Sequence, residues 1–191
     1  MPRVAPTEDD RIWTVEDLAS FPDDGPRYEL LHGELLLMPL ATSPHQRVAK
    51  DLVYLLEVWC RATTGWDVRA PASVPIGRTT QLEPDAALYP IERYSRADWA
   101  ALPVPALVIE VLSPSTRARD RHRKRPTYLQ HGVGEVWTVD VDARFIERWS
   151  ARSDFPVLEQ QSFEWTPAPG MPSMLVAFDE VFGPDTGTIG R

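Results

Sequence analysis

The sequence predicts an α/β fold, in which a β-sheet is flanked by α-helices, and three observations lead to this prediction. Residues 105–142 read as a strand, a basic helix and a second strand. Residues 43–65 carry apolar side chains at spacings of three and four, which is typical of an amphipathic helix. Residues 28–38 hold two apolar segments around His32-Gly33, which favours a β-hairpin or a bulged strand pair.

The length and composition of the chain predict one domain. Its 191 residues include no glycine- or serine-rich linker and are 43% hydrophobic, enough for one core at residues 14–182 with loose ends at 1–10 and 184–191. The single Cys60 excludes an internal disulfide and a cysteine-rich zinc site. Because neither a signal peptide nor an apolar run of about 18 residues is present, we expect a soluble, cytoplasmic protein that does not enter a membrane.

Charge is distributed unevenly along the chain. The formal net charge of −8 argues against a non-specific nucleic-acid coat protein, which would be basic. Residues 117–125 hold six of the 20 basic and one of the 28 acidic side chains, so the remainder carries 14 against 27. This local positive charge could steer phosphate towards one face of the molecule, or it could be a solvated helix face.

Two helices are predicted before residue 66. Residues 14–20 form a short helix, with Thr14 as its N-cap and Asp17 three residues later, close to a capping box. The longer amphipathic helix begins with Ser43 as N-cap, a proline at the first helical position and Gln46 to close the box.

His45 and Asp85 are polar residues of the next region that could serve a site. His45 lies in the first turn of the long helix, where it could contact a phosphate or be an exposed polar group. Residues 67–76 contain two prolines and suit an edge strand. Residues 82–89 contain the next predicted strand, which begins just beyond Pro84, and Asp85 at its mouth could cap a turn or take part in a site.

A carboxylate interrupts the apolar run at residues 106–112. The run is long enough for a buried strand and too short for a typical helix, yet Glu110 lies in its middle. Because burying that charge unpaired would cost several kcal/mol, Glu110 needs a cation. Either an Arg or Lys forms a structural ion pair with it, or Glu110 binds a divalent metal at a strand end while the basic segment faces a polyanion.

Pro126 leaves two interpretations of the basic helix open. Inside a helix it would remove the hydrogen bond to the His122 carbonyl and kink the helix, which could re-aim Lys124. Alternatively, the regular helix begins near Arg125 with Pro126 at its first position, and the arginines before it lie on a loop.

The remaining segments add strands to the predicted sheet. Residues 91–102 predict a loop with a short helical turn. Residues 135–141 and 144–150 predict two strands joined by a two-residue turn, which is a hairpin signal. Residues 174–182 predict a strand or short helix that covers the edge of the sheet.

Acidic residues on the predicted strands could meet in a sheet. Glu29 or Glu34, Asp85 and Glu110 lie on strand-like segments that loops separate. Hard oxygen ligands of this type select Mg²⁺ or Mn²⁺ rather than zinc. Such a cation could lower the pKa of a water that attacks phosphorus and neutralise the developing negative charge.

Six short segments combine into a specific pattern. They are ELLHGEL at 29–35, PHQRV at 44–48, EPDAAL at 83–88, VIEVLSPST at 108–116, DRHRK at 120–124 and YLQHGVGEVWTVD at 128–140. Together they resemble the Uma-type family of restriction-endonuclease-like proteins, within the PD-(D/E)XK nuclease superfamily. The resemblance spans about residues 14–182 and implies a restriction-endonuclease-like mixed β-sheet flanked by α-helices.

The resemblance also implies a metal site. Asp85 and Glu110 would bind Mg²⁺ or Mn²⁺ together with the main-chain carbonyl of Val111. The lysine that the superfamily places two residues after the glutamate is replaced by Leu112 in this chain. Lys124 on the following helix is the best substitute, because its long side chain could reach back over the strand end.

We therefore predict a metal-dependent endonuclease that hydrolyses DNA phosphodiester bonds. The predicted catalytic residues are Asp85, Glu110, Lys124 and Glu34, with Glu29 and Lys50 in reserve. Nucleic-acid contacts are predicted at Arg117, Arg119, Arg121, Arg123 and His45. Many nucleases of this fold cut two strands as symmetric dimers, so the resemblance also implies a homodimer.

Two other functions stay open at this point. Leu112 at the usual lysine position and the acidic balance of the chain favour a catalytically silent nuclease fold that binds DNA or protein. A closed pocket too narrow for a duplex would instead favour hydrolysis of a small phosphorylated substrate. No phosphate-cradling glycine loop or Ser-His-Asp arrangement points to another enzyme class.

Overall fold

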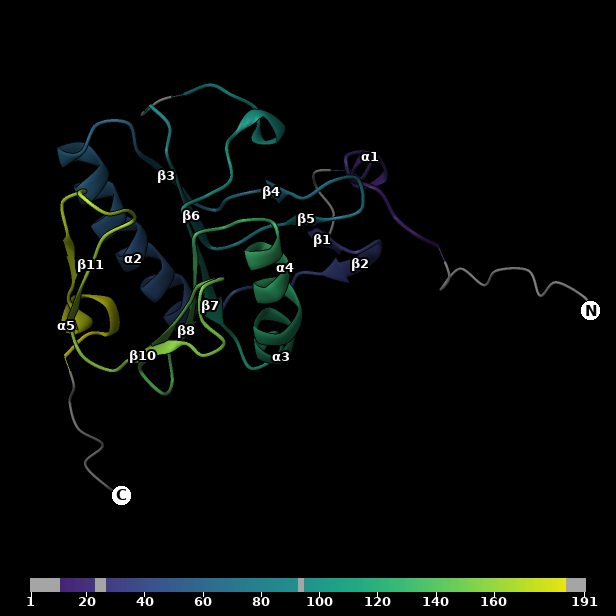
Figure 1. Cartoon of the computed structure of the whole chain (residues 1–191). Coiled ribbons are helices and arrows are strands. Elements are labelled where there is room, and N and C mark those ends of the chain that lie inside the picture. The colour runs from purple at the N-terminus through teal and green to yellow at the C-terminus, as the bar shows by residue number, and fades with distance from the viewer. Residues whose placement is uncertain (1–10, 23–26, 93–94, 185–191) are drawn as a thin grey trace, which may run out of the picture. The chain divides into compact units, whose positions relative to one another are not determined.

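The chain is described by a computed structural model over residues 11–22, 27–92 and 95–184 (Figure 1). The predicted loose ends at 1–10 and 184–191 lie outside the described residues, apart from Pro184. Among the helices of these described ranges, none is long and apolar enough to cross a membrane.

Two compact units make up the chain. The first unit comprises residues 1–40 and 73–83, and the second comprises residues 41–72 and 84–191. That these units form one domain stays a prediction.

The first unit contains a four-stranded antiparallel sheet and a short helix. The helix α1 (Val15–Leu18) begins with the predicted capping box, in which Thr14 and Asp17 bond reciprocally through side chain and backbone. The strand order is β2 (Glu34–Leu37), β1 (Tyr28–Leu31), β5 (Gln81–Leu82) and β4 (Val74–Pro75).

The strands β1 and β2 form the hairpin that the sequence predicts. Leu31 pairs with Glu34, so only two residues make the turn. Both His32 (φ 54°) and Gly33 (φ 83°) have positive φ, the conformation that a two-residue type I′ turn requires.

The second unit contains a six-stranded mixed sheet. β7 and β8 are parallel, and the other neighbours are antiparallel. The strand order is β10 (Val157–Glu159), β9 (Phe145–Trp149), β8 (Glu135–Asp140), β7 (Leu107–Leu112), β6 (Ala86–Tyr89) and β3 (Asp67–Arg69).

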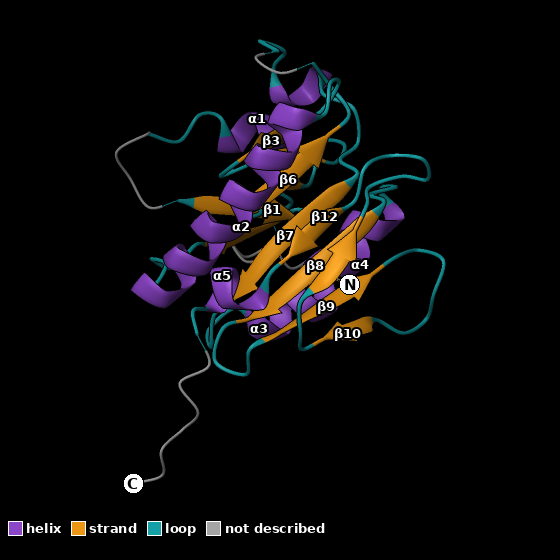
Figure 2. Ribbon diagram, turned by 90° about the vertical axis from the view of Figure 1, so that its left-hand side faces the viewer, coloured by secondary structure: helices purple, strands orange, loops and turns teal. Residues whose placement is uncertain are grey.

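Helices cover both faces of this sheet (Figures 1 and 2). The long helix α2 (Ser43–Ala62) lies on one face. Parallel strands need a crossover connection, and here it consists of α3 (Arg117–Arg119), the π-helix η3 (Asp120–Lys124) and α4 (Arg125–Gln130) on the other face.

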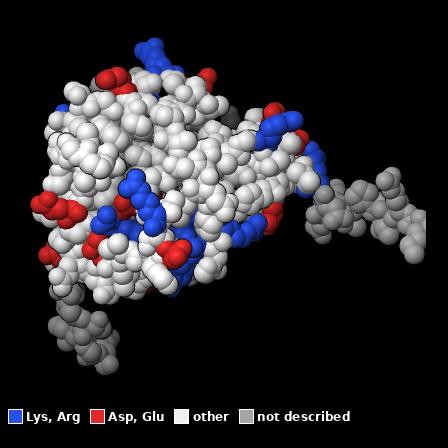
Figure 3. Space-filling model, viewed as in Figure 1, with Lys and Arg blue, Asp and Glu red and all other residues white. Residues whose placement is uncertain are grey.

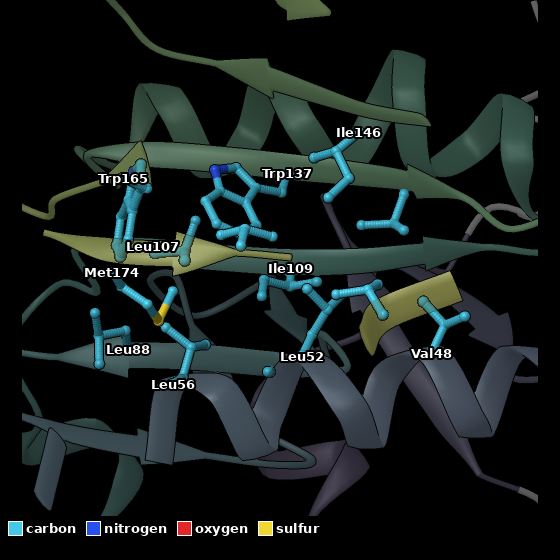
Figure 4. Close-up of a cluster of buried hydrophobic side chains, with 14 of the residues drawn as sticks. Val48, Leu52, Leu56, Leu88, Leu107, Ile109, Trp137, Ile146, Trp165 and Met174 are labelled. Atoms are coloured by element: carbon cyan, nitrogen blue, oxygen red, sulfur yellow. The ribbon is translucent and has the colours of Figure 1, made fainter. Parts of the chain in front are cut away.

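The core of the second unit lies between α2 and the sheet (Figure 4). Leu52 and Leu56 of α2 are each 1% exposed, and they pack with Ile109 of β7 and Trp137 of β8, both fully buried. Because side chains alternate along a strand, the residues of β7 and β8 next to these core positions point to the opposite face, which the crossover covers. Glu110 is one of them.

The C-terminal segment packs into this core and not over the edge of the sheet. β11 (Phe163–Trp165) and β12 (Met174–Val176) pair with each other, and α5 (Phe178–Phe182) follows them. Met174, Val176 and Phe178 belong to the same buried cluster as α2. The predicted edge cover at residues 174–182 is therefore wrong, because apolar side chains on both elements fill the face beneath α2.

Two other local predictions have different outcomes. The strand predicted just beyond Pro84 is present as β6, which begins at Ala86, whereas Leu82 before the proline belongs to β5 of the first unit. The N-cap of α2 is Thr42 and makes no side-chain cap bond, so the predicted box from Ser43 is not formed. The predicted helical turn within 91–102 is present as η2 (Trp99–Ala101).

Candidate active site

The pairing of β6 with β7 brings two predicted site residues together. Ala86 pairs with Ile109, so the same antiparallel register places Asp85 opposite Glu110. The backbone N–H of Val111 donates a hydrogen bond of 2.8 Å to Asp85 Oδ2. The Asp85 carboxylate is thus fixed at the end of β6, on the same face of the sheet as Glu110.

Lys124 neutralises the buried Glu110. Its Nζ lies 3.1 Å from Glu110 Oε1 and 3.3 Å from Oε2, and the hydroxyl of Tyr128 donates a 2.8 Å hydrogen bond to Oε1. Glu110 is 4% exposed and Lys124 is 2% exposed. The cation that the sequence requires near Glu110 therefore comes from the crossover helix, through a side chain that reaches the strand.

A π-helical turn carries Lys124 to this position. The N–H of Arg125 donates to the carbonyl of Asp120, five residues earlier, and Pro126 has no N–H for the carbonyl of His122. The crossover is helical from Arg117 onwards, so the arginines do not lie on a loop. The regular helix α4 still begins at Arg125, as one of the two interpretations expects.

Asp120 is a third carboxylate near the pair, and the sequence interpretation gave it no role. Its side chain is 3% exposed, and Oδ1 lies 3.5 Å from Lys124 Nζ. Oδ1 lies 3.9 Å from Nε of Arg119 and accepts no hydrogen bond. The signal that could have found Asp120 is its spacing of four residues from Lys124, which puts both side chains on one helix face.

His45 contacts Asp85 from the first turn of α2. Its Nε2 lies 3.4 Å from Asp85 Oδ2, and its side chain is 12% exposed. Burial lowers the pKa of His45, but hydrogen bonding to Asp85, the charge of Asp85, the Val111 carbonyl and the charge of Asp120 together raise it above its ordinary value. Contact of His45 with nucleic acid stays a prediction.

Most of the predicted DNA-binding arginines form ion pairs within the protein. Arg117 lies 3.1 Å from Asp140, and Arg121 lies 3.1 Å from Glu147. Arg119 is largely buried beside Asp120, whereas Arg123 is exposed. On the face shown in Figure 3, basic and acidic side chains lie side by side and form no continuous basic surface.

The remaining candidates lie apart from this cluster or in the first unit. Lys50 is 74% exposed on α2 and pairs with Asp51 at 3.4 Å. Glu34 is exposed on β2 of the first unit, and Glu29 is buried in β1, where its Oε1 accepts the N–H of Glu83.

The donor set of the cluster fits a small divalent cation. Asp85 and Glu110 supply carboxylate oxygens on one face of the sheet. Val111, which follows Glu110 in the chain, donates its backbone N–H to Asp85. In the described ranges, no group of three or more His, Cys, Asp or Glu could hold a metal by itself. Two carboxylates are nevertheless enough for Mg²⁺, which usually keeps several waters and binds substrate phosphates.

Comparisons with known proteins agree with this fold. The family model described as "Uma2: Putative restriction endonuclease" matches residues 15–176. A crystal structure described as "a putative nuclease belonging to DUF820" from Anabaena variabilis ATCC 29413 is similar, with a TM-score of 0.71 and 16% sequence identity over 88% of this chain and 97% of that chain. None of the curated proteins matches the chain.

Proposed function

The chain belongs to the Uma2 family of restriction-endonuclease-like proteins, and from this premise we propose that it is a metal-dependent endonuclease that hydrolyses DNA phosphodiester bonds. The observation that carries the proposal is the meeting of Asp85 and Glu110 on neighbouring strands, with Lys124 Nζ 3.1 Å from Glu110. Two acids beside one ammonium group are suited to phosphodiester hydrolysis, because they combine cation binding with a proton donor.

Asp85 and Glu110, with the carbonyl of Val111, would hold Mg²⁺ or Mn²⁺. When bound, such a cation supplies positive charge that stabilises the developing charge on the phosphoryl oxygens and lowers the pKa of a water at the site. The hydrogen bonds from Tyr128 to Glu110 and from Val111 to Asp85 keep each carboxylate in a fixed orientation.

Lys124 would act on the reacting groups directly. Its ammonium group, which contacts Glu110 at 3.1 Å, would donate a hydrogen bond to a phosphoryl oxygen or to the attacking water when substrate is bound. Leu112, which is 4% exposed, occupies the position on β7 where the superfamily has its lysine. Lys124 of the crossover helix would supply the ammonium group in its place.

DNA would approach from the crossover side, where Arg123 is exposed. We propose a homodimer as the active form, because two copies of the site would cut both strands of a duplex. The acidic remainder of the chain would discourage contacts elsewhere on the molecule.

Cleavage of supercoiled plasmid tests this function. We expect the purified chain to nick the plasmid with Mg²⁺ or Mn²⁺ and not with EDTA. Asp85→Asn should abolish nicking and keep the melting temperature, because the amide oxygen of Asn can still accept the hydrogen bond from Val111. Equal cleavage by the variant and the original chain would remove Asp85 from the mechanism.

A catalytically silent DNA- or protein-binding module is the second candidate. Leu112 at the usual lysine position and the acidic balance of the chain favour it. Plasmid binding that weakens steeply with salt, with no product at any metal concentration, would select this function.

A further inference from the structure

We propose that Asp120 is a positioning residue, which holds the amine of Lys124 beside Glu110 while the site acts on its substrate. This inference rests on the proposed function, because Asp120 would affect turnover through the catalytic role proposed for Lys124.

Two buried carboxylates flank the Lys124 amine. Nζ lies 3.1 Å from Glu110 Oε1 and 3.5 Å from Asp120 Oδ1. The side chains of Lys124, Asp120 and Glu110 are 2%, 3% and 5% exposed, so water screens these charges weakly. One carboxylate comes from the strand β7 and the other from the helical turn that ends at Lys124.

The surroundings of Asp120 direct its charge to Lys124. Oδ1 accepts no hydrogen bond, and its other near cation, Nε of Arg119, is farther away at 3.9 Å. A buried carboxylate oxygen without a hydrogen bond raises the free energy of the folded state, and buried polar groups are nearly always hydrogen-bonded. Because Asp120 Oδ1 lies without a hydrogen bond close to the Lys124 amine, we infer that Asp120 acts on that amine.

The π-helical backbone around Asp120 also favours its contact with Lys124. Asp120 and Lys124 are the first and last residues of the π-helix η3. The N–H of Arg125 closes its wide turn by donating to the carbonyl of Asp120, and the next residue, Pro126, has no N–H to donate. Single π-helical turns recur at functional sites. This turn presents both side chains towards β7.

A helical lysine needs such an anchor more than a strand lysine does. A lysine two residues after Glu110 would project from the same rigid strand, whereas Lys124 reaches Glu110 on a flexible four-carbon stem. If Glu110 also binds a cation, its hold on the amine weakens. Asp120 then keeps the amine in place.

The lysine content of the chain allows a direct spectroscopic test. Lys50 and Lys124 are the only lysines, so an ¹⁵N-labelled full chain gives at most two lysine ammonium signals. Lys50 is 74% exposed and pairs with Asp51, so Asp51→Asn is a matched control for Asp120→Asn. We expect Asp120→Asn to shift or broaden the Lys124 ammonium signal at constant pH, and Asp51→Asn to leave it unchanged.

Kinetics supply the second readout. Asp120→Asn should lower kcat by about 10- to 100-fold with an unchanged KM for DNA, the usual range for partners of a site residue. The double variant Asp120→Asn/Lys124→Met should be no slower than Lys124→Met alone. If the asparagine variant does not fold, Asp120→Glu moves the charge by one methylene and should likewise shift the Lys124 signal.

The two proposals fail in different ways. An unchanged Lys124 signal in Asp120→Asn or Asp120→Glu would overturn the positioning role, as would a changed signal with unchanged kcat. If the original chain cleaves no DNA under any condition, the proposed function fails, and the ammonium signal alone then decides whether Asp120 holds Lys124.

Discussion

Glu110 connects the central strand to the crossover helix through one buried cation. Its oxygens contact Lys124 Nζ and the Tyr128 hydroxyl, which lie one turn apart. A buried pair of this kind adds little stability over apolar side chains of similar size, but loss of one partner leaves an uncompensated charge. The pair is therefore better understood as preparation of a site than as a stabilising device.

This arrangement predicts an asymmetric response to mutation. Without metal, Lys124→Met should lower the free energy of unfolding by about 3–5 kcal/mol, because Glu110 loses its cation. The double variant Glu110→Gln/Lys124→Met should recover part of that loss, since residue 110 then carries no charge, while the buried Asp120 still lacks Lys124 and keeps Arg119 at 3.9 Å. Urea unfolding in EDTA measures both variants. A Lys124→Met variant as stable as the original chain would contradict the importance of the pair.

Elements with strong local signals could be predicted from the sequence. Leu52, Leu56 and Trp59 recur with helical spacing and define α2, and His32-Gly33 defines the hairpin of β1 and β2. The start of β6 just beyond Pro84 could also be predicted, because proline cannot donate a hydrogen bond to a sheet.

The candidate site could be predicted only in part. The motifs around Asp85 and Glu110 indicated which acids would meet, and Lys124 was the lysine nearest to them on the following helix. Asp120 received no role, because its spacing from Lys124 puts both side chains on one helix face but does not show that this face touches β7. The π-helical turn that sets this face depends on tertiary packing.

The capping box of α1 predicts a pH-dependent helix start. Hydrogen bonds from the side chain and backbone of Thr14 lower the pKa of Asp17, with a smaller contribution from Arg11. Because the folded-state pKa is lowered, this contribution is present above the unfolded-state pKa and is lost as the pH falls through the folded-state value.

An NMR titration of the Asp17 carboxyl carbon checks this sign. The pKa should lie below the ordinary value in the original chain and should rise towards it in Thr14→Ala, which removes the main hydrogen-bond partner. An unchanged Asp17 pKa in that variant would show that the capping box does not act on the carboxylate.

At the scale of the whole molecule, the proposed function requires an acidic protein to bind an acidic polymer. The net charge of −8 opposes such binding, and two of the crossover arginines, Arg117 and Arg121, form ion pairs with Asp140 or Glu147. Under the proposed function, we expect binding to depend on a few exposed cations of the crossover and on cations at the site itself.

Salt dependence measures how many exposed arginines take part. In an Asp85→Asn background, Arg123→Ala should reduce the slope of log binding constant against log salt by about 0.9, the value for one phosphate contact on a duplex. Arg61→Ala is the control, because Arg61 is 64% exposed on α2 and pairs with Glu57. Equal slopes for Arg123→Ala and the parent would place the DNA elsewhere.

The most direct test of the central claim is a crystal structure of the chain soaked in Mn²⁺, with anomalous data. We expect an anomalous peak in contact with Asp85, Glu110 and the carbonyl of Val111, and a Lys124 amine that stays within reach of Asp120. An absence of manganese between Asp85 and Glu110 at saturating Mn²⁺, with Lys124 still paired to Glu110, would contradict it.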